Sequence, residues 1–387
     1  MDRVERANAM NAAEYINPRT GATWTTDKAI WKAPDDGGYV NLTAGTGLSP
    51  DDIDRSENSL WRYGAAVRLP RPPETTLGAG WTPLLKTNWN GRPVHMKADH
   101  LMVSGSFKDR GTAVMLNYLK QAGVTAILED SSGNAGASAA AYAAALDLDC
   151  RIMVPASAPT AKKVQMATMG AEVVAIAGTR DDVADAALAA SETTFYASHN
   201  HQPFFLEGTK TVAFELWEQL GFRAPDCVIA PLGQGSNIIG SHIGFTELLA
   251  AGQIDRLPRI CAVQAAHCAP YHAAFLSGDE TIQPFPAQPT IADGIASATP
   301  VRLPEVLAAV RDSGGTIITA SEDEIVQGFS QLARQGFFVE PTTGAVGAGL
   351  TKLIAQDAIR PEETVSAILT GSGLKAVEKI GSALSLV

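Results

Sequence analysis

The chain has 387 residues, of which 45% are hydrophobic, so it can bury a large core, which we expect to form two lobes. Its formal net charge of −11 argues against nucleic acid or an anionic membrane as a partner, because both are polyanions. No stretch approaches the ~18 consecutive apolar residues of a membrane span, and the charged residues 1–6 are not followed by the apolar core of a signal peptide.

The cysteines lack the paired spacing of a metal site. They are Cys150, Cys227, Cys261 and Cys268. We therefore expect no bound metal, and free thiols in a cytoplasmic protein, because the cytoplasm is reducing.

Residues 1–75 are mixed and rich in turn residues, whereas from about residue 95 onward short apolar runs alternate with helical stretches. The runs expected to be strands are residues 125–129, 150–154, 172–177, 227–232, 260–263, 316–319 and 365–369. Strands separated by helices predict parallel sheets that are covered by helices on both faces. The fold class predicted is therefore α/β.

The ten residues from Ser104 to Ala113 place Lys108 where a loop of small residues becomes a helix. Beside the positive end of a helix, and partly desolvated, the charged ammonium form is disfavoured and the neutral amine becomes a better nucleophile. This setting suits a lysine that forms an imine. The alternative is an ordinary solvated lysine in the first turn of a helix.

Two further loops have the pattern of anion sites. Residues 131–138 read Ser-Ser-Gly-Asn-Ala-Gly-Ala-Ser and precede an alanine-rich helical run, and residues 233–237 read Gly-Gln-Gly-Ser-Asn between an apolar run and a helix. A strand, a loop of small residues and a helix together direct backbone N–H groups at an anion. Each loop alone is also compatible with a tight turn, but two such loops and the lysine turn in one chain indicate a shared site.

With these motifs in place, the chain resembles the pyridoxal-phosphate enzymes of the tryptophan-synthase β-chain class, and within that class it is most similar to the threonine synthases. The resemblance also includes Trp81-Thr-Pro-Leu84, Glu207-Gly-Thr-Lys-Thr211 and Leu369-Thr-Gly-Ser-Gly-Leu-Lys375. It implies pyridoxal 5'-phosphate as cofactor, a fold type II architecture of two lobes, and usually a homodimer. The expected large cofactor-binding lobe is residues 1–99 with 199–387, the smaller inserted lobe is residues 100–198, and the active site lies in the cleft between the lobes.

The resemblance also implies roles for individual residues. Lys108 should hold the cofactor covalently and then shuttle protons, and Asn134 should face the hydroxyl oxygen of the cofactor ring. The substrate carboxylate is expected at Ser131, Ser132, Gly133 and Ala135, and the cofactor phosphate at Gly233, Gln234, Gly235, Ser236 and Asn237. Thr370, with Ser372 as a second candidate, should meet the pyridine nitrogen. A neutral hydroxyl there leaves the nitrogen largely unprotonated, which favours elimination and replacement over transamination.

The sequence departs from the threonine synthase pattern at Phe205. The family generally has an arginine before its Leu-Glu-Gly motif, and that arginine helps to bind the phosphate of the substrate, O-phosphohomoserine. A phenyl ring supplies no charge, and losing a charged partner at a buried anion typically costs about 2–5 kcal/mol. Lys210, Arg110 or a histidine are the candidates to replace the missing charge.

Three functions therefore remain open. The first is a threonine synthase that converts O-phosphohomoserine and water into threonine and phosphate. The second is a related ammonia-lyase, dehydratase or β-replacement enzyme that acts on an unphosphorylated amino acid, with Phe204 and Phe205 lining a more apolar pocket. The third is a non-catalytic amino-acid-binding relative, for which an imine-forming Lys108 has no use. The roles of Glu340, His199 and His201 also remain open.

Overall fold

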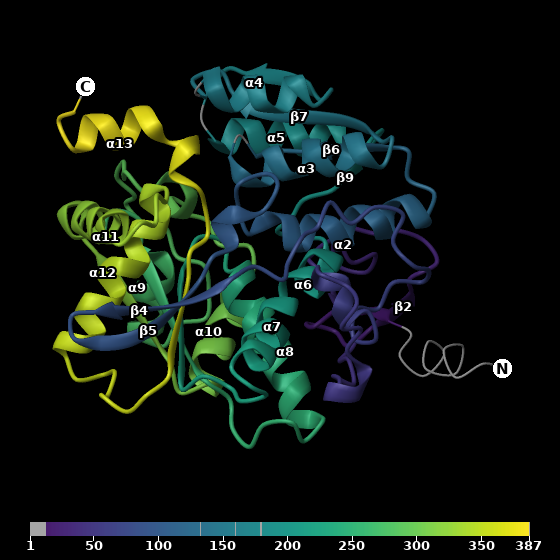
Figure 1. Cartoon of the computed structure of the whole chain (residues 1–387). Helices are drawn as coiled ribbons and strands as arrows, with labels where there is room; N and C mark the ends of the chain where they lie inside the picture. The colour runs from purple at the N-terminus through teal and green to yellow at the C-terminus, as the bar shows by residue number, and fades with distance from the viewer. Residues whose placement is uncertain (1–12, 132, 159, 179, 387) are drawn as a thin grey trace. The chain divides into compact units, whose positions relative to one another are not determined.

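The computed structural model describes residues 13–131, 133–158, 160–178 and 180–386 (Figure 1). Contacts divide the chain into two compact units: unit 1 comprises Met1–Trp81 and Lys108–Thr211, and unit 2 comprises Thr82–Phe107 and Val212–Val387. The predicted lobe limits, residues 1–99 with 199–387 and residues 100–198, stay a prediction.

Unit 2 is built on a six-stranded sheet in the order β12-β11-β10-β13-β5-β4. All neighbouring strands are parallel except β4 and β5, which form an antiparallel hairpin. The strands are β4 (Leu84–Trp89), β5 (Arg92–Lys97), β10 (Cys227–Pro231), β11 (Arg259–Ala265), β12 (Thr316–Ala320) and β13 (Val365–Ile368). The parallel arrangement predicted from the apolar runs is confirmed.

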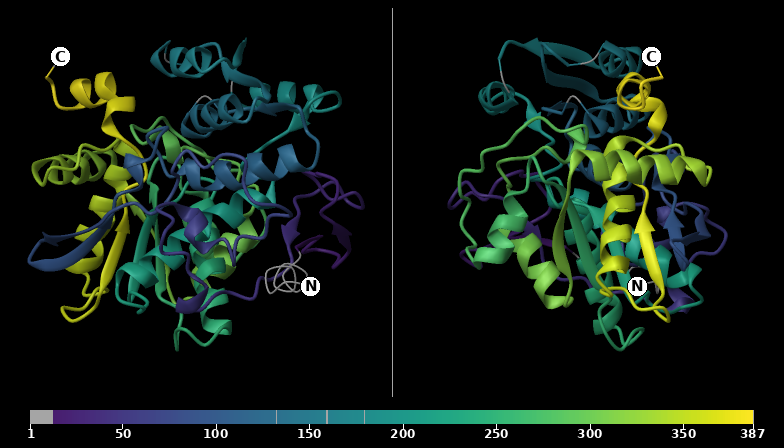
Figure 2. Two further views of the ribbon diagram at one scale, coloured as in Figure 1. Left: turned by 45° about the vertical axis from the view of Figure 1, so that its right-hand side comes forward. Right: turned by 90° about the vertical axis from the view of Figure 1, so that its left-hand side faces the viewer.

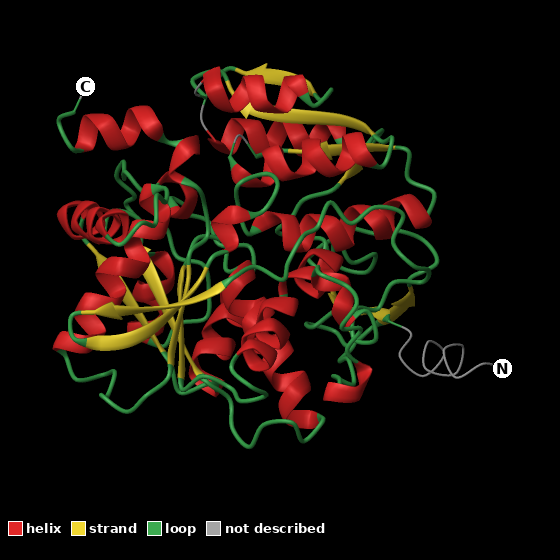
Figure 3. Cartoon of the chain, viewed as in Figure 1, coloured by secondary structure: helices red, strands yellow, loops and turns green. Residues whose placement is uncertain are grey.

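Helices cover both faces of this sheet (Figures 2 and 3). Along β10, Cys227 and Ile229 belong to a core cluster with residues of α11 and α12. Because side chains alternate along a strand, Val228 and Ala230 face the opposite side, where α8 and α10 pack. The helices are α7 (Thr211–Gln219), α8 (Ser236–Ala250), α9 (Pro270–Ser277), α10 (Leu303–Asp312), α11 (Glu322–Arg334), α12 (Pro341–Ala355) and α13 (Val377–Ala383), with 3-10 turns at Asp99–Leu101, Asp293–Ile295 and Gly373–Lys375.

Unit 1 contains a parallel four-stranded sheet in the order β8-β7-β6-β9. Its elements are α2 (Lys108–Gln121), β6 (Ala126–Glu129), α3 (Asn134–Ala145), β7 (Asp149–Pro155), α4 (Thr160–Thr168), β8 (Glu172–Ile176), α5 (Arg180–Ala190), β9 (Phe195–Tyr196) and α6 (Pro203–Thr209). Ile152 and Val154 of β7 pack with residues of α3 and α4, whereas Met153 between them packs with residues of α5. The sheet is therefore covered by helices on both faces, as predicted.

The start of unit 1 forms a small antiparallel sheet in the order β2-β1-β3. Its strands are β1 (Glu14–Ile16), β2 (Thr23–Thr25) and β3 (Asn41–Leu42), and the 3-10 turns Pro50–Asp52 and Leu60–Tyr63 follow. The Tyr15 hydroxyl donates to the Tyr118 hydroxyl at 2.7 Å, and the Tyr118 ring stacks on Phe204 with centroids 3.7 Å apart. These aromatic contacts fix α2 and α6 against the amino-terminal sheet.

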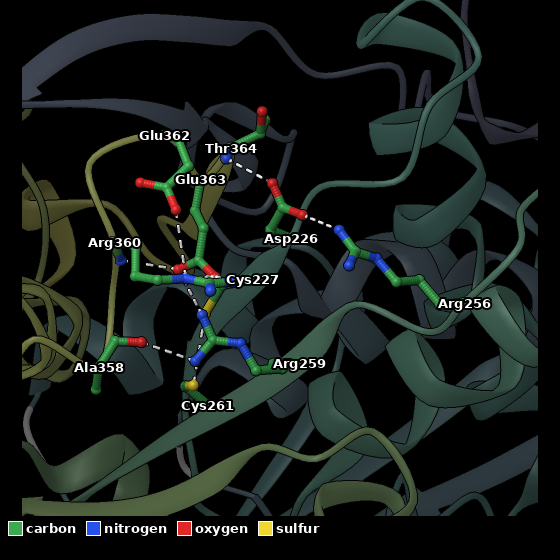
Figure 4. Close-up of polar contacts among 10 residues, drawn as sticks. All are labelled: Asp226, Cys227, Arg256, Arg259, Cys261, Ala358, Arg360, Glu362, Glu363 and Thr364. Carbon is green, nitrogen blue, oxygen red and sulfur yellow. Dashed lines mark hydrogen bonds and ion pairs between the residues drawn. The ribbon is translucent and has the colours of Figure 1, made fainter.

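The amino ends of the central strands of unit 2 are tied together by charged side chains (Figure 4). Arg259, which begins β11, pairs with Glu363 at 2.7 Å, and Asp226 pairs with Arg256 and accepts the backbone N–H of Thr364. This cluster lies at the amino ends of the strands. The loops singled out from the sequence lie at the other end of the sheet, where the strands have their carboxyl ends.

Within the described ranges, no helix is long and apolar enough to cross a membrane. All four cysteines are free thiols, and three of them are buried.

Candidate active site

Two predicted cofactor-binding segments follow neighbouring strands at the carboxyl end of the unit 2 sheet. Strands β10 and β13 are parallel neighbours, with Ile229 beside Ala367. Their carboxyl ends therefore lie side by side, and the loops that follow them contain Gly233–Asn237 and Thr370. In open parallel sheets, ligands bind at the carboxyl ends of the strands.

The loop after β10 is shaped as an anion cradle at the start of α8. Gly235 has φ +94°, a left-handed conformation that glycine adopts without strain, and it precedes the first residue of a 15-residue helix. A Cβ atom added to Gly233 would lie 2.8 Å from the carbonyl oxygen of Gly294. Both positions therefore require glycine, and the turn they form brings the backbone of this loop to the positive end of the helix.

Asn237 supplies the clearest sign that this cradle takes a ligand. Its side chain is 3% exposed, yet neither its Oδ1 nor its Nδ2 has a hydrogen-bond partner among the described residues. Buried polar groups are nearly always paired, so this amide, which has no partner in the described part of the chain, is suited to bind a ligand. The fit to a phosphate is good, because the adjacent helix start contributes N–H donors.

Gln234 has a different part in the same loop. Its side-chain amide donates to Ser297 and to the carbonyl of Thr299, and its Oε1 accepts the N–H of Val301 at 3.0 Å. The side chain therefore braces the loop against residues 297–301, which leaves only its backbone for an anion. Ser236, the first residue of α8, is buried beside it.

The loop after β13 is held between two other segments of unit 2. Ser106 pairs with Gly371, Phe107 donates its N–H to the carbonyl of Thr370 at 2.9 Å, and Val339 pairs with Ser372. Phe107 directly precedes Lys108 in the chain. Thr370 is thus fixed on the backbone by the segment that leads into the predicted reactive lysine.

Glu340 lies against this loop. It precedes α12, but its side chain makes no cap hydrogen bond to that helix. Its carboxylate instead lies over Gly371, where an added Cβ atom would be 2.1 Å from Oε1. The Glu340 side chain therefore faces the loop after β13 and does not cap α12.

Lys108 is the first residue of α2 in unit 1. Its Nζ lies 5.4 Å from the centroid of the Phe205 ring. The next residue, Asp109, accepts a 2.6 Å hydrogen bond from Ser138 of α3. Since this bond links the starts of α2 and α3, it fixes the lysine turn relative to the other small-residue loop.

That loop runs from β6 into α3. Asn134 is the first residue of α3 and Ala135 the second, and the Gly133 N–H donates to the Ser131 hydroxyl at 3.3 Å. A Cβ atom at Gly136 would lie 2.0 Å from the Ser131 carbonyl oxygen, so the turn closes tightly on the helix. The predicted carboxylate ligand Ser132 lies outside the described residues.

Phe205 is fully buried in α6, where that helix crosses α2. A Cβ atom at Gly111 would lie 2.6 Å from three carbons of the Phe205 ring. Likewise, a Cβ atom at Gly208 would lie 2.1 Å from the Arg110 carbonyl oxygen. The two glycines let the helices approach closely, and this approach is what presents the Phe205 ring to Lys108.

The cations suggested as substitutes for the missing arginine are engaged elsewhere in unit 1. Glu207 binds Lys210 Nζ at 2.7 Å and Arg68 Nε at 3.0 Å, and all three side chains are buried. Arg110 is also fully buried and donates to the Thr211 hydroxyl.

The two histidines left open by the sequence behave differently. The Nδ1 atom of His199 lies 2.9 Å from Glu129 Oε1, and its ring centroid is 5.6 Å from that of Phe205. His201 instead contacts Ser198 and the Trp31 ring. Only His199 therefore belongs to the surroundings of Phe205.

Sequence reasoning missed two residues that contact the predicted site residues, Glu129 in unit 1 and Thr343 in unit 2. Glu129 ends β6 and pairs with His199, and Thr343 contacts Thr370. A carboxylate at the end of an apolar strand was a usable signal for Glu129, because charged residues are rarely buried unless they are paired.

Comparisons with known proteins agree with this geometry. A family profile described as "Pyridoxal-phosphate dependent enzyme" matches residues 75–371. The threonine synthase of Methanosarcina acetivorans is 32% identical over 366 residues, which cover 92% of this chain and 90% of that protein. The threonine synthase of Methanocaldococcus jannaschii is 35% identical over 339 residues, covering 85% and 83% respectively.

Among solved structures, a threonine deaminase from T.th. is similar with a TM-score of 0.65 and 26% identity, covering 75% of this chain and 92% of that one. The profile spans both anion loops, Lys108 and Thr370. These similarities confirm the family resemblance and the cofactor that it implied. The chain belongs to the family of pyridoxal-phosphate dependent enzymes.

Proposed function

We propose that the protein is a threonine synthase, which converts O-phosphohomoserine and water into threonine and phosphate. The observation that carries this proposal is its 32–35% identity to threonine synthases over 83–90% of their length. When bound, pyridoxal phosphate supplies an electron sink for the carbanion that forms on the amino-acid substrate. The chain has to bind both molecules, fix their orientation and move protons.

The anion cradle, residues 233–237, is the proposed binding site of the cofactor phosphate. The backbone N–H groups in the first turn of α8, which begins at Ser236, have no acceptor within the helix, and the unpartnered Asn237 amide adds donor and acceptor atoms. Thr370 is proposed to meet the pyridine nitrogen and Asn134 the ring hydroxyl oxygen. A neutral partner at each place adds no charge to the ring.

The loop before α3 is the proposed site of the substrate carboxylate. The first turn of a helix has N–H groups without partners in the helix, and they favour an anion. The residues proposed for it are Ser131, Ser132, Gly133 and Ala135, of which Ser132 lies outside the described residues.

Lys108 is proposed to hold the cofactor and then to transfer protons at the substrate carbons. Its amine stands at the start of α2 beside the apolar Phe205 ring. A base that transfers protons between adjacent carbons has to be held within hydrogen-bond reach of both. The Asp109–Ser138 bond and the close helix crossing provide that rigidity.

A second candidate function is favoured by the Phe205 contacts. The ring lies beside Lys108, while Lys210 is paired with Glu207 and Arg110 is fully buried. A substrate phosphate near this ring would also approach the Glu129 carboxylate, which pairs with His199. These contacts support an ammonia-lyase, dehydratase or β-replacement enzyme acting on an unphosphorylated amino acid.

Product analysis separates the two candidates. Cofactor-loaded protein is mixed with O-phosphohomoserine, and phosphate and threonine are measured; equal amounts of both support threonine synthase. If neither forms, serine and threonine are tested for release of ammonia and a keto acid, which supports the second candidate. Phe205→Arg should raise phosphate release if position 205 faces the substrate phosphate, and Phe205→Leu, which restores no charge, is its control.

We also propose that the protein works in the cytoplasm as a homodimer. The four free thiols fit a reducing compartment, and the homodimer follows from the family resemblance. Light scattering on the purified protein tests the dimer, and a mass equal to that of one chain contradicts it.

A further inference from the structure

We propose that Thr343 is a positioning residue, which directs the hydroxyl proton of Thr370 toward the pyridine nitrogen of the cofactor. The inference rests on the function proposed above, because it takes Thr370 as the partner of that nitrogen. It adds a residue on a different element, the first turn of α12, to the one that the family resemblance assigns.

The contact between the two threonines is direct and buried. Thr343 Oγ1 lies 2.9 Å from Thr370 Oγ1, and the two residues are 0% and 1% exposed. Thr343 Oγ1 also accepts the N–H of Gly371 at 3.1 Å. One hydroxyl on α12 therefore binds both the side chain of Thr370 and the backbone of the residue after it.

The number of available protons decides the direction of the bond. Each hydroxyl has one proton to donate. For Thr343 the acceptors within reach are Thr370 Oγ1 at 2.9 Å and the Gly371 carbonyl at 3.5 Å. That carbonyl already accepts the Glu340 N–H at 3.0 Å, and 3.5 Å is the limit of a useful bond. The shorter bond is favoured, so Thr343 donates to Thr370.

This direction leaves the Thr370 proton for another acceptor. Among the described residues, the hydrogen-bond partner of the Thr370 hydroxyl is Thr343. A buried hydroxyl that accepts one bond and has a proton to give suits an acceptor such as an unprotonated ring nitrogen. Had Thr370 donated to Thr343, it would present only lone pairs and would suit a protonated ring instead. Thr343 thus favours the unprotonated ring that elimination and replacement require.

The surrounding backbone makes this a question of side-chain orientation rather than of loop folding. Phe107 binds the Thr370 carbonyl from one side, and Glu340 binds the Gly371 carbonyl from the other. Removing one hydroxyl from α12 leaves these two backbone bonds in place, and the backbone contact that it does remove is the one from the Gly371 N–H. Thr343→Val is nearly the same shape as threonine and removes only the hydroxyl.

The test measures cofactor binding and the absorbance of the bound cofactor in a double-mutant cycle. The dissociation constant of pyridoxal phosphate is measured for wild type, Thr343→Val, Thr370→Val and the double variant, together with the cofactor spectrum across pH. Losing one neutral hydrogen bond corresponds to a weakening of about 3- to 10-fold. We expect that weakening and a changed spectrum for Thr343→Val, recovery in Thr343→Ser, and no further weakening in the double variant beyond Thr370→Val alone.

Thr351→Val is the matched control. Thr351 lies on the same helix, and its hydroxyl binds the Gly347 carbonyl and Trp89 Nε1. Its loss should lower thermal stability without changing the dissociation constant or the spectrum. If Thr343→Val does not fold, Thr343→Ala and Thr343→Ser carry the same comparison.

Two different failures can be told apart. The positioning role is wrong if Thr370→Val weakens cofactor binding but Thr343→Val only lowers the melting temperature, as we expect for Thr351→Val. It is also wrong if the effects of Thr343→Val and Thr370→Val on the dissociation constant add fully in the double variant. If Thr370→Val itself changes neither binding nor spectrum, the assignment of Thr370 in the proposed function is wrong, and the inference fails with it.

Discussion

Replacing Glu207 by glutamine should destabilise the protein strongly, because this carboxylate is the anion of a buried charge cluster. It is 3% exposed and binds Arg68 through both carboxylate oxygens, at 3.0 and 3.1 Å, and Lys210 at 2.7 Å. The neutral amide leaves two buried cations without their counter-ion. Breaking a buried pair in this way typically costs about 3–5 kcal/mol.

The pKa of Glu207 gives a second estimate of the same quantity. Burial by itself raises this pKa, but the charges of Lys210 and Arg68 and their hydrogen bonds lower it from 4.5 to about 2. A difference of this size corresponds to about 3 kcal/mol of stability at neutral pH. Because the folded pKa is the lower one, this stability is present above the unfolded pKa and is lost as the pH falls toward 2. By about pH 3.5, roughly 1.4 kcal/mol of it should be gone.

Urea unfolding of wild type and Glu207→Gln across pH measures both effects. The difference between the two proteins should be largest at neutral pH and should shrink steadily below about pH 5. Glu172→Gln is the control, because Glu172 forms a 2.6 Å pair with Arg151 but its side chain is 59% exposed. Surface pairs contribute little. Equal stabilities for Glu207→Gln and wild type, or a difference that does not vary with pH, would refute the reasoning.

Three further predictions concern packing and reactivity. Gly111→Ala should lower the free energy of unfolding by about 1–3 kcal/mol, because the added Cβ atom meets the Phe205 ring. Denaturant unfolding should show that adding Phe205→Leu recovers part of this loss, whereas fully additive losses would contradict the contact. Gly235→Ala should lower the melting temperature, because the φ of +94° and the nearby Val306 exclude a Cβ atom. It should also abolish the rise in melting temperature that added pyridoxal phosphate gives the wild-type protein. An unchanged rise would place the cofactor phosphate elsewhere. The thiols should react slowly with a disulfide reagent at about pH 8 until the protein is unfolded. Cys227, Cys261 and Cys268 are buried, and burial raises the pKa of Cys150 to about 12. Rapid reaction of the folded protein would contradict this burial.

Strands β6, β7, β8, β10, β11, β12 and β13 were predictable because each of them is an apolar run between helices, whereas the two-residue β9 was not among the predicted runs. The β4–β5 hairpin was missed, although Asn90-Gly91 at its turn is a strong hairpin signal and both residues have positive φ. Strand β4 is the edge strand of the sheet, and its exposed positions such as Leu85 and Lys86 dilute the apolar pattern. A search for apolar runs alone does not find such strands.

The site was predictable only in the parts that are local in sequence. The loop at Gly233–Asn237 and the lysine turn at Lys108 each show their chemistry within a few residues. Thr343 does not, because its contact with Thr370 joins residues 27 positions apart. Phe204 also required the structure, because the sequence predicts it as a pocket residue together with Phe205, whereas its ring stacks on Tyr118 in the core of unit 1.

The attachment site of the cofactor tests the central claim most directly. Protein loaded with pyridoxal phosphate is reduced with borohydride and digested, and the modified peptide is identified by mass spectrometry, with Lys108→Ala treated in parallel. We predict a single modified lysine, Lys108, and no covalent label in the variant. A label on another lysine such as Lys97 or Lys210, or a label retained by Lys108→Ala, would contradict the assignment of the active site.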